Sequence, residues 1–219
     1  MSAIGDFHHF ETAFPNEFVP DVLRLLLAEW PKVTRPDANP LENRITNRFV
    51  GHLRMVMRKQ DRPHLRFDCR PKLTSASEDS EVGEIDIQVT SYSPHPDAFL
   101  VIECKRLNTE NASGFQSGAG EYVGKQGMGR FISKQYESGG DVGVMLGYVM
   151  TRTIDDAMQS IDTQLAVRYR ELKMLPPFRF ADSKILPNRR HVKQTTHNLD
   201  GEFEFVIVHA LVHFSKLRP

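Results

Sequence analysis

The chain has 219 residues and a mass of 25.0 kDa, and its 28 Lys and Arg residues balance its 28 Asp and Glu residues. Hydrophobic residues make up 40% of the sequence and charged residues 26%, which excludes a disordered chain, a collagen-like repeat and a uniformly basic nucleic-acid coat protein. Two cysteines, Cys69 and Cys104, are too few for a disulfide scaffold. The first residues show no signal-peptide pattern, and no apolar run is long enough to span a membrane. We therefore expect a cytoplasmic protein without a membrane partner.

The charges are segregated along the chain. Residues 42–72 carry nine Lys and Arg against three acids, residues 78–86 carry five acids and no base, and residues 168–193 carry eight bases against two acids. Two basic stretches around an acidic one are typical of a polyanion-binding surface around a metal centre. Solvated surface charge that happens to segregate gives the same pattern, so both interpretations stay open.

The first 40 residues are rich in aromatic residues and proline, and residues 21–30 predict one short helix. Residues 41–59 predict a longer helix whose apolar stripe consists of Leu41, Ile45, Phe49, Leu53 and Val56. Residues 64–73 alternate as a strand, with Leu65, Phe67 and Cys69 on one face.

Two further strands are predicted next. Residues 83–89 alternate strictly, which places Ile85, Ile87 and Val89 on one face and Glu84, Asp86 and Gln88 on the other. Residues 98–105 form an apolar run that is typical of a central strand covered on both faces. In such a strand Glu103 and Lys105 share a face, and Cys104 points into the opposite layer.

The rest of the chain alternates between predicted loops, helices and strands. Residues 108–120 predict a mobile loop, residues 121–136 a helix and residues 142–150 an apolar strand. Residues 151–170 predict a helix capped by Thr151 or Thr153, with Asp155 and Asp156 in its first turn. Residues 176–200 are expected to be irregular and basic, and residues 202–214 to form a closing strand.

This order of elements predicts one α/β domain with a mixed sheet flanked by helices. Its parts would be an N-terminal extension (1–40), a core (41–150) and a C-terminal helix, basic segment and closing strand (151–219).

Asp86, Glu103 and Lys105 are the residues with the clearest chemistry, because two adjacent predicted strands present them to one point. Charges in a central strand are costly unless they are paired or bound to a metal. Two carboxylates and a lysine match a Mg²⁺ site that activates water near a phosphate, with Mn²⁺ as a substitute. Lys105 would then orient the water or stabilise the transition state. A structural ion pair between Glu103 and Lys105 is the alternative.

With Glu42 in the first long helix, Asp86 in Gly83–Ile87 and the triplet Glu103-Cys104-Lys105, the chain resembles the PD-(D/E)XK nuclease superfamily. Residues 99–107 are similar to the version found in bacterial defence and restriction nucleases. The resemblance covers residues 41–150 and implies a restriction-endonuclease-like fold with an αβββαβ core.

The resemblance also implies roles for individual residues. Asp86 and Glu103 would bind the metal, Cys104 would lend its main-chain carbonyl, and Lys105 would serve the water. Glu42 would reach the metal directly or through water, although a helix-start acid is also favoured there by the helix dipole.

One element departs from the family pattern. The Gln-x-x-x-Tyr motif of the exonuclease-like branch is absent, and Gln126 and Arg130 stand one helical turn apart instead. Arg130, with Gln126 beside it, is a candidate contact to the scissile phosphate, unless it pairs with a surface acid. Arg106, Arg189 and Arg190 are further candidate substrate contacts, and we expect the two basic stretches to flank the metal site.

Other chemistries fit less well. His209 and His213 lie in a predicted strand, roughly 13 Å apart at 3.3 Å per residue, so one zinc ion cannot bind both. The sequence has no dinucleotide fingerprint, phosphate-binding loop or serine-hydrolase elbow.

These features predict a Mg²⁺-dependent nuclease that cuts DNA in restriction, repair or anti-phage defence. The alternative is a catalytically inactive nuclease-like domain that binds nucleic acid or a partner subunit. Aromatic residues in the two irregular segments predict either packing on the same domain or the interface of a homodimer or larger complex. They are Phe7, Phe10, Phe14, Phe18, Trp30, Phe178 and Phe180.

Overall fold

The computed structural model describes residues 15–35, 37, 39–59, 65–74, 81–91, 99–136, 140–199, 201 and 204–214. Phe7, Phe10 and Phe14 lie outside the described residues, as do Arg62, Glu78 and Asp79 of the charged stretches. The helices are α1 (Val19–Glu29), α2 (Glu42–Lys59), α3 (Ala119–Val123), α4 (Met128–Ile132) and α5 (Ile154–Arg168), with short 3-10 turns at Asn16–Phe18 and Trp30–Lys32. The strands are β1 (Leu65–Cys69), β2 (Lys72–Thr74), β3 (Glu81–Glu84), β4 (Ile87–Ser91), β5 (Phe99–Leu107), β6 (Thr109–Asn111), β7 (Gly114–Gln116), β8 (Val142–Val149), β9 (Ala181–Asp182), β10 (Val192–Asn198) and β11 (Glu204–His213).

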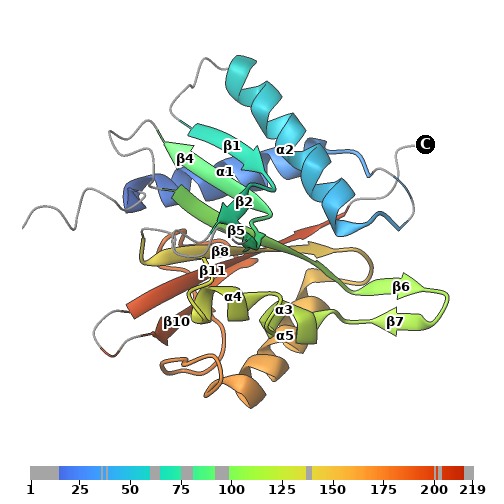
Figure 1. Ribbon diagram of the computed structural model, residues 1–219. Coiled ribbons are helices and arrows are strands. Elements are labelled where there is room, and N and C mark those ends of the chain that lie inside the picture. Colours follow the sequence, from blue (N-terminus) through green and yellow to red (C-terminus); the bar gives the residue numbers. More distant parts are fainter. Residues whose placement is uncertain are drawn as a thin grey trace, which may run out of the picture.

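A seven-stranded mixed sheet organises the fold, in the order β1-β4-β5-β8-β11-β10-β9 (Figure 1). Strands β5, β8 and β11 are parallel, and the outer strands on both sides pair antiparallel. Two small hairpins, β2–β3 and β6–β7, lie outside this sheet. The predicted α/β class with a mixed sheet flanked by helices is therefore confirmed.

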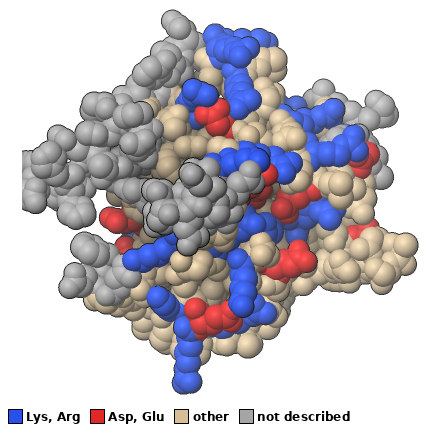
Figure 2. All heavy atoms as spheres, viewed as in Figure 1, with Lys and Arg blue, Asp and Glu red and all other residues tan. Residues whose placement is uncertain are grey.

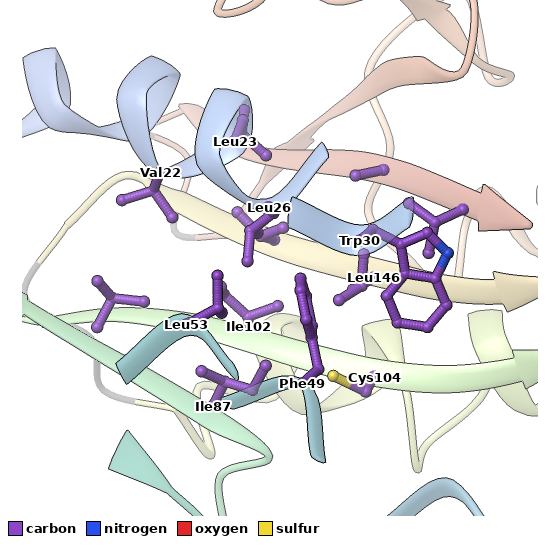
Figure 3. Close-up of a cluster of buried hydrophobic side chains, with 14 of the residues drawn as sticks. Val22, Leu23, Leu26, Trp30, Phe49, Leu53, Ile87, Ile102, Cys104 and Leu146 are labelled. Atoms are coloured by element: carbon purple, nitrogen blue, oxygen red, sulfur yellow. The ribbon is translucent and has the colours of Figure 1, made fainter. Parts of the chain in front are cut away.

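Helices cover both faces of the sheet. Helices α1 and α2 cover one face, where Leu26, Phe49 and Leu146 belong to one buried cluster (Figure 3). Helices α3, α4 and α5 cover the other face (Figure 1), with Tyr122 and Phe131 in a second cluster. Strand β8 is buried along its whole length because it has a helical layer on each side. No helix among the described residues is long and apolar enough to cross a membrane.

The helices predicted at residues 41–59 and 151–170 are confirmed as α2 and α5. Four residues of the α2 stripe are buried, while Leu41 stands before the first turn and is 63% exposed. Helix α5 begins with a capping box in which Thr153 Oγ1 accepts from the Asp156 amide at 3.1 Å. The Asp156 carboxylate in turn accepts from the Thr153 amide at 3.0 Å. Of the two predicted caps, Thr153 is therefore the N-cap.

The aromatic residues of the two irregular segments that the structure describes pack within the chain. Trp30 stacks on Tyr148 with ring centroids 5.0 Å apart, and its Nε1 donates to the His213 carbonyl at 2.8 Å. Phe180 meets the His209 ring edge-on at 4.9 Å. Phe18 packs against the α1–α2 cluster, and Phe178, although exposed, contacts Tyr169. These contacts support packing on the same domain, and an interface stays a prediction.

Two strand predictions around Asp86 were wrong in detail. The strand predicted at residues 64–73 is divided into β1 and β2 at Arg70, whose φ is 58°, and Pro71. The alternation at residues 83–89 is divided into β3 and β4, since β3 pairs with β2 whereas β4 pairs with β1 and β5. As a result Ile85 lies in the α3–α5 cluster and Ile87 in the α1–α2 cluster, on opposite faces of the sheet.

Three later predictions also needed correction. Residues 108–120 include the β6–β7 hairpin instead of an irregular loop. The helix predicted at 121–136 is interrupted around Gly127, where a Cβ would lie 2.1 Å from the Tyr122 carbonyl oxygen, and becomes α3 and α4. The segment 176–200 contributes β9 and β10 to the main sheet, because its residues 192–198 pair in register with β11.

A chain of hydrogen bonds runs through the buried layer between β10, β11 and α3. His197 Nδ1 donates to the Leu172 carbonyl at 2.7 Å, so its Nε2 accepts from the Thr195 hydroxyl at 2.8 Å. Thr195 Oγ1 then accepts from His209 Nε2 at 2.9 Å, and His209 Nδ1 accepts from the Tyr122 hydroxyl at 3.0 Å. Every member is satisfied with both imidazoles neutral.

Candidate active site

The candidate site forms where β4 stops pairing with β5. Their ladder ends with Ile87 opposite Ile102, so β4 offers no acceptor to the amides of Cys104 and Arg106 farther along β5. Two carboxylates take its place: Asp86 Oδ2 accepts from the Cys104 amide at 2.7 Å, and Glu42 Oε2 accepts from the Arg106 amide at 2.9 Å. Because buried amides need partners, these bonds fix both acids at the edge of β5.

Glu103 is the centre of the site and is fully buried. Its Oε1 accepts from Lys105 Nζ at 2.7 Å. Its Oε2 accepts a short hydrogen bond from the Tyr136 hydroxyl and a longer one, at 3.4 Å, from Arg130 Nη1. A buried carboxylate is tolerable only with such compensation.

Lys105 connects the remaining oxygen atoms of the site. Its ammonium donates to Glu103 Oε1 at 2.7 Å, to the Cys104 carbonyl at 2.9 Å and to Glu42 Oε1 at 3.4 Å. These are three of the groups that the family resemblance implies as metal ligands. The structure thus brings Glu42, Asp86, Glu103 and Lys105 together, as the sequence predicted.

The pKa values of the three acids in this cluster are raised, which favours their protonated forms. Burial raises the pKa of Glu103 to about 7, with Asp86 adding to the rise and Lys105 opposing it. Burial also raises the pKa values of Asp86 and Glu42, again against the opposing charge of Lys105. For Lys105, burial lowers the pKa, but the three carboxylates more than compensate and bring it to about 12. The ammonium is therefore charged at neutral pH. Because burial disfavours the ionised carboxylates, a cation close to them stabilises their ionised form.

Arg130 belongs to the wall of the site. Its Nη2 donates to Gln126 Oε1 at 2.8 Å, although Gln126 lies in the turn before α4 and not on the same helix. Its Nη1 donates to the Tyr136 hydroxyl at 2.6 Å and to the Glu84 carbonyl at 3.1 Å. Arg130 therefore pairs with the buried acid Glu103 rather than with a surface acid, and it helps to position that carboxylate.

Tyr136 is the site residue that the sequence did not reveal. It is 4% exposed, and burial raises the pKa of its hydroxyl, with the negative charge of Glu103 adding to the rise. It therefore acts as a donor to Glu103 throughout the physiological pH range. Its position four residues after the end of α4 has no motif that predicts this contact.

An open cleft of about 630 Å³ is lined by Glu42 of the site. Glu42 and Arg106 form one wall, and the β6–β7 hairpin and the start of α3 contribute Gln116, Ser117 and Glu121. The Arg106 guanidinium donates to the Pro40 carbonyl at 3.1 Å. On the face drawn in Figure 2, basic side chains gather over α2 and the strands next to it, with acids between them. Of the site residues, Glu42 is the one whose side chain lines this cleft.

The second basic stretch lies elsewhere. Arg189 and Arg190 line a separate pocket of about 380 Å³ in the β9–β10 connection, and Arg190 pairs with Asp155 at 2.5 Å. Lys193, at the start of β10, is in register through β11 and β8 with Glu103, which puts it three strand spacings away, or roughly 14 Å. The structure does not bring these three residues to the carboxylates, so any contact with nucleic acid would occur on a distant part of a bound strand.

The donor set fits a hard divalent cation in its chemistry. Carboxylates of Asp86, Glu103 and Glu42 and the carbonyl of Cys104 are the oxygen ligands that Mg²⁺ prefers. As they stand, however, no three His, Cys, Asp or Glu side chains in the described part of the chain converge closely enough to hold a metal ion. The Lys105 ammonium supplies the positive charge between them in this structure.

Replacement of Asp86 by alanine is expected to destabilise the fold by about 1–3 kcal/mol more than replacement by asparagine. Both variants lose the charge, but Asp86→Asn retains an acceptor for the Cys104 amide. Urea unfolding of both variants in EDTA measures the difference. Equal free energies of unfolding would show that the hydrogen bond does not hold the β5 edge.

Comparison with protein-family models finds no family that matches the chain, and comparisons with curated proteins and with solved structures find no match either. A function is therefore proposed from the chemistry of the site residues alone.

Proposed function

We propose that this protein is a divalent-metal-dependent nuclease of the restriction-endonuclease-like class, which hydrolyses phosphodiester bonds of DNA in restriction, repair or anti-phage defence. One observation carries the proposal. Glu42, Asp86 and the Glu103–Lys105 triplet come from three separate segments, yet their charged groups meet at the edge of one central strand. The succession α2, β1, β4, β5, the α3–α4 pair and β8 supports the same fold class.

In this proposal Asp86, Glu103, the Cys104 carbonyl and Glu42 hold Mg²⁺ or Mn²⁺. When bound, the ion lowers the pKa of a coordinated water and neutralises charge on the phosphoryl group. Tyr136 and Arg130 hold Glu103 Oε2, so that Oε1 remains directed toward Lys105. Lys105 contributes a point charge beside the reacting phosphate. DNA would enter through the cleft beside Glu42.

A second candidate function is a catalytically inactive nuclease-like domain that binds nucleic acid or a partner subunit. The contacts of Lys105 favour it, because a single ammonium already satisfies Glu103, Glu42 and the Cys104 carbonyl. In that case the charged cluster would be a structural ion-pair network.

The test is a panel of labelled single-stranded DNA, duplex DNA, supercoiled plasmid and RNA, incubated with the full chain and Mg²⁺, Mn²⁺ or EDTA. We expect cleavage of DNA with either metal and none in EDTA. Cleavage in EDTA would contradict the mechanism. Binding without cleavage across the whole panel would favour the inactive domain. Nicking of the plasmid without linearisation would indicate a single site, whereas linearisation would favour a homodimer.

A further inference from the structure

The ammonium of Lys105 lies among the oxygens that would hold a metal ion. It is within 2.9 Å of Glu103 Oε1 and the Cys104 carbonyl and 3.4 Å from Glu42 Oε1. Only 11% of its side chain is exposed. A lysine that merely oriented water at the rim of a metal site would not need contacts with the ligands on three sides.

The charge balance of the cluster shows which cation occupies the position between the carboxylates. Glu42, Asp86 and Glu103 carry three negative charges when ionised, and Lys105 and Arg130 supply two positive ones. Arg130 is directed to Glu103 Oε2 by its bonds with Tyr136 and the Glu84 carbonyl, so it stays on one side of the carboxylate. Lys105 is thus the cation that bonds both Glu103 Oε1 and Glu42 Oε1.

We infer that Lys105 and the divalent ion compete for one position, so that metal binds by displacing the ammonium from Glu103, the Cys104 carbonyl and Glu42. This inference rests on the proposed metal-dependent function and adds a control of metal affinity to it. The flexible four-carbon stem of lysine permits the displacement. Glu42, whose Oε1 lies 3.4 Å from the ammonium, also lines the open cleft, so a displaced ammonium would move toward that side of the site.

Competition of this kind lowers the apparent affinity for metal by the fraction of molecules in which the position is free. Removal of the ammonium is therefore expected to tighten metal binding even though it removes a residue of the reaction. A lysine whose role is confined to the chemical step would leave metal affinity unchanged.

The experiment is calorimetric titration of the full chain with MgCl₂ and with MnCl₂, without nucleic acid, for the wild type, Lys105→Met, Lys105→Arg and the control Lys184→Met. Lys184 is an exposed lysine at the far side of the sheet, in the β9–β10 connection. We expect Lys105→Met to bind either metal about tenfold more tightly than the wild type. Lys105→Arg retains a cation and should stay near the wild type, as should Lys184→Met.

Each outcome decides the inference. Equal or weaker binding by a folded Lys105→Met variant overturns the competition while leaving the metal-dependent function intact. Absence of binding in all four proteins overturns both. If Lys105→Met does not fold in metal-free buffer, refolding with and without MgCl₂ replaces the titration. Recovery only with Mg²⁺ supports the shared position, and failure to recover overturns it.

Discussion

Replacement of Glu103 by glutamine is expected to lower the rate of the proposed metal-dependent DNA cleavage by roughly 10³-fold, because it removes the central negative charge that would hold the metal. The side chain is fully buried and bonds with Lys105, Tyr136 and Arg130, so an isosteric amide preserves its shape. The measurement is the single-turnover cleavage rate at saturating Mg²⁺, alongside thermal unfolding to verify that the variant is folded.

Glu84→Gln is the matched control for this variant. Glu84 stands two residues before Asp86, but its side chain is partly exposed and forms an ion pair with Arg70, and it is the main-chain carbonyl of Glu84, which the substitution retains, that accepts from Arg130. We expect its cleavage rate to remain near that of the wild type. An equal loss in both variants would point to a general effect of acidic charge, and full activity of a folded Glu103→Gln protein would remove Glu103 from the mechanism.

Acidification is expected to weaken the fold through the buried histidines. Burial lowers the pKa of His197 from its ordinary 6.5 to about 4, and it also lowers the pKa of His209 well below 6.5. Between pH 4 and pH 6.5 the imidazole of His197 is mostly protonated in the unfolded chain and mostly neutral in the folded chain. Stability from His197 is therefore present above pH 6.5 and is lost as the pH falls toward 4, with a loss of about 2 kcal/mol at pH 5.

Comparison of His197→Gln with the wild type isolates this contribution. Glu103 acts in the opposite sense, since its pKa of about 7 is raised and its stabilising protonation is lost as the pH rises. The pH dependence of the wild type alone is thus a sum of opposing effects, to which His209, Asp86 and Glu42 also contribute. Urea unfolding at pH 7.5 and pH 5 should show a smaller acid loss in His197→Gln. The exposed His213→Gln should retain the full loss, and an unchanged loss in both variants would refute the prediction.

The convergence of the charged residues was predictable because it depends on strand order and on alternation within β5. Glu103 and Lys105 follow from an apolar run that ends in charges, since charges at the end of a buried strand must be paired or bound to a metal. The stripe of α2 and the cap at Thr153 were equally accessible, because both depend on local spacing.

The parts that the sequence did not reveal depend on pairing between distant segments. The alternation at residues 83–89 does not show that Ile85 and Ile87 lie on opposite faces of the main sheet. Both faces are covered by apolar clusters, so an isoleucine fits on either face and the sequence pattern is the same. Strand β10 contains the polar Thr195 and His197, which are buried and hydrogen-bonded to each other, and Thr195 also bonds with the buried His209 of β11. Tyr136 donates to Glu103 from the segment after α4, a contact between residues 33 positions apart in the chain.

Under the proposed nuclease function, the early end of β4 has a consequence for recognising relatives that have lost activity. Asp86 and Glu42 complete the backbone of β5, and selection for folding alone would retain an oxygen acceptor at both positions after cleavage had been lost. Glu103 makes no such bond, since its contacts are with the side chains of Lys105, Tyr136 and Arg130. Under that function, a lineage that lost activity and did not keep the cluster as a structural ion-pair network would replace Glu103 together with Lys105 and leave Asp86 and Glu42 in place. Loss of the first pair would then mark the loss of activity better than any change in the second.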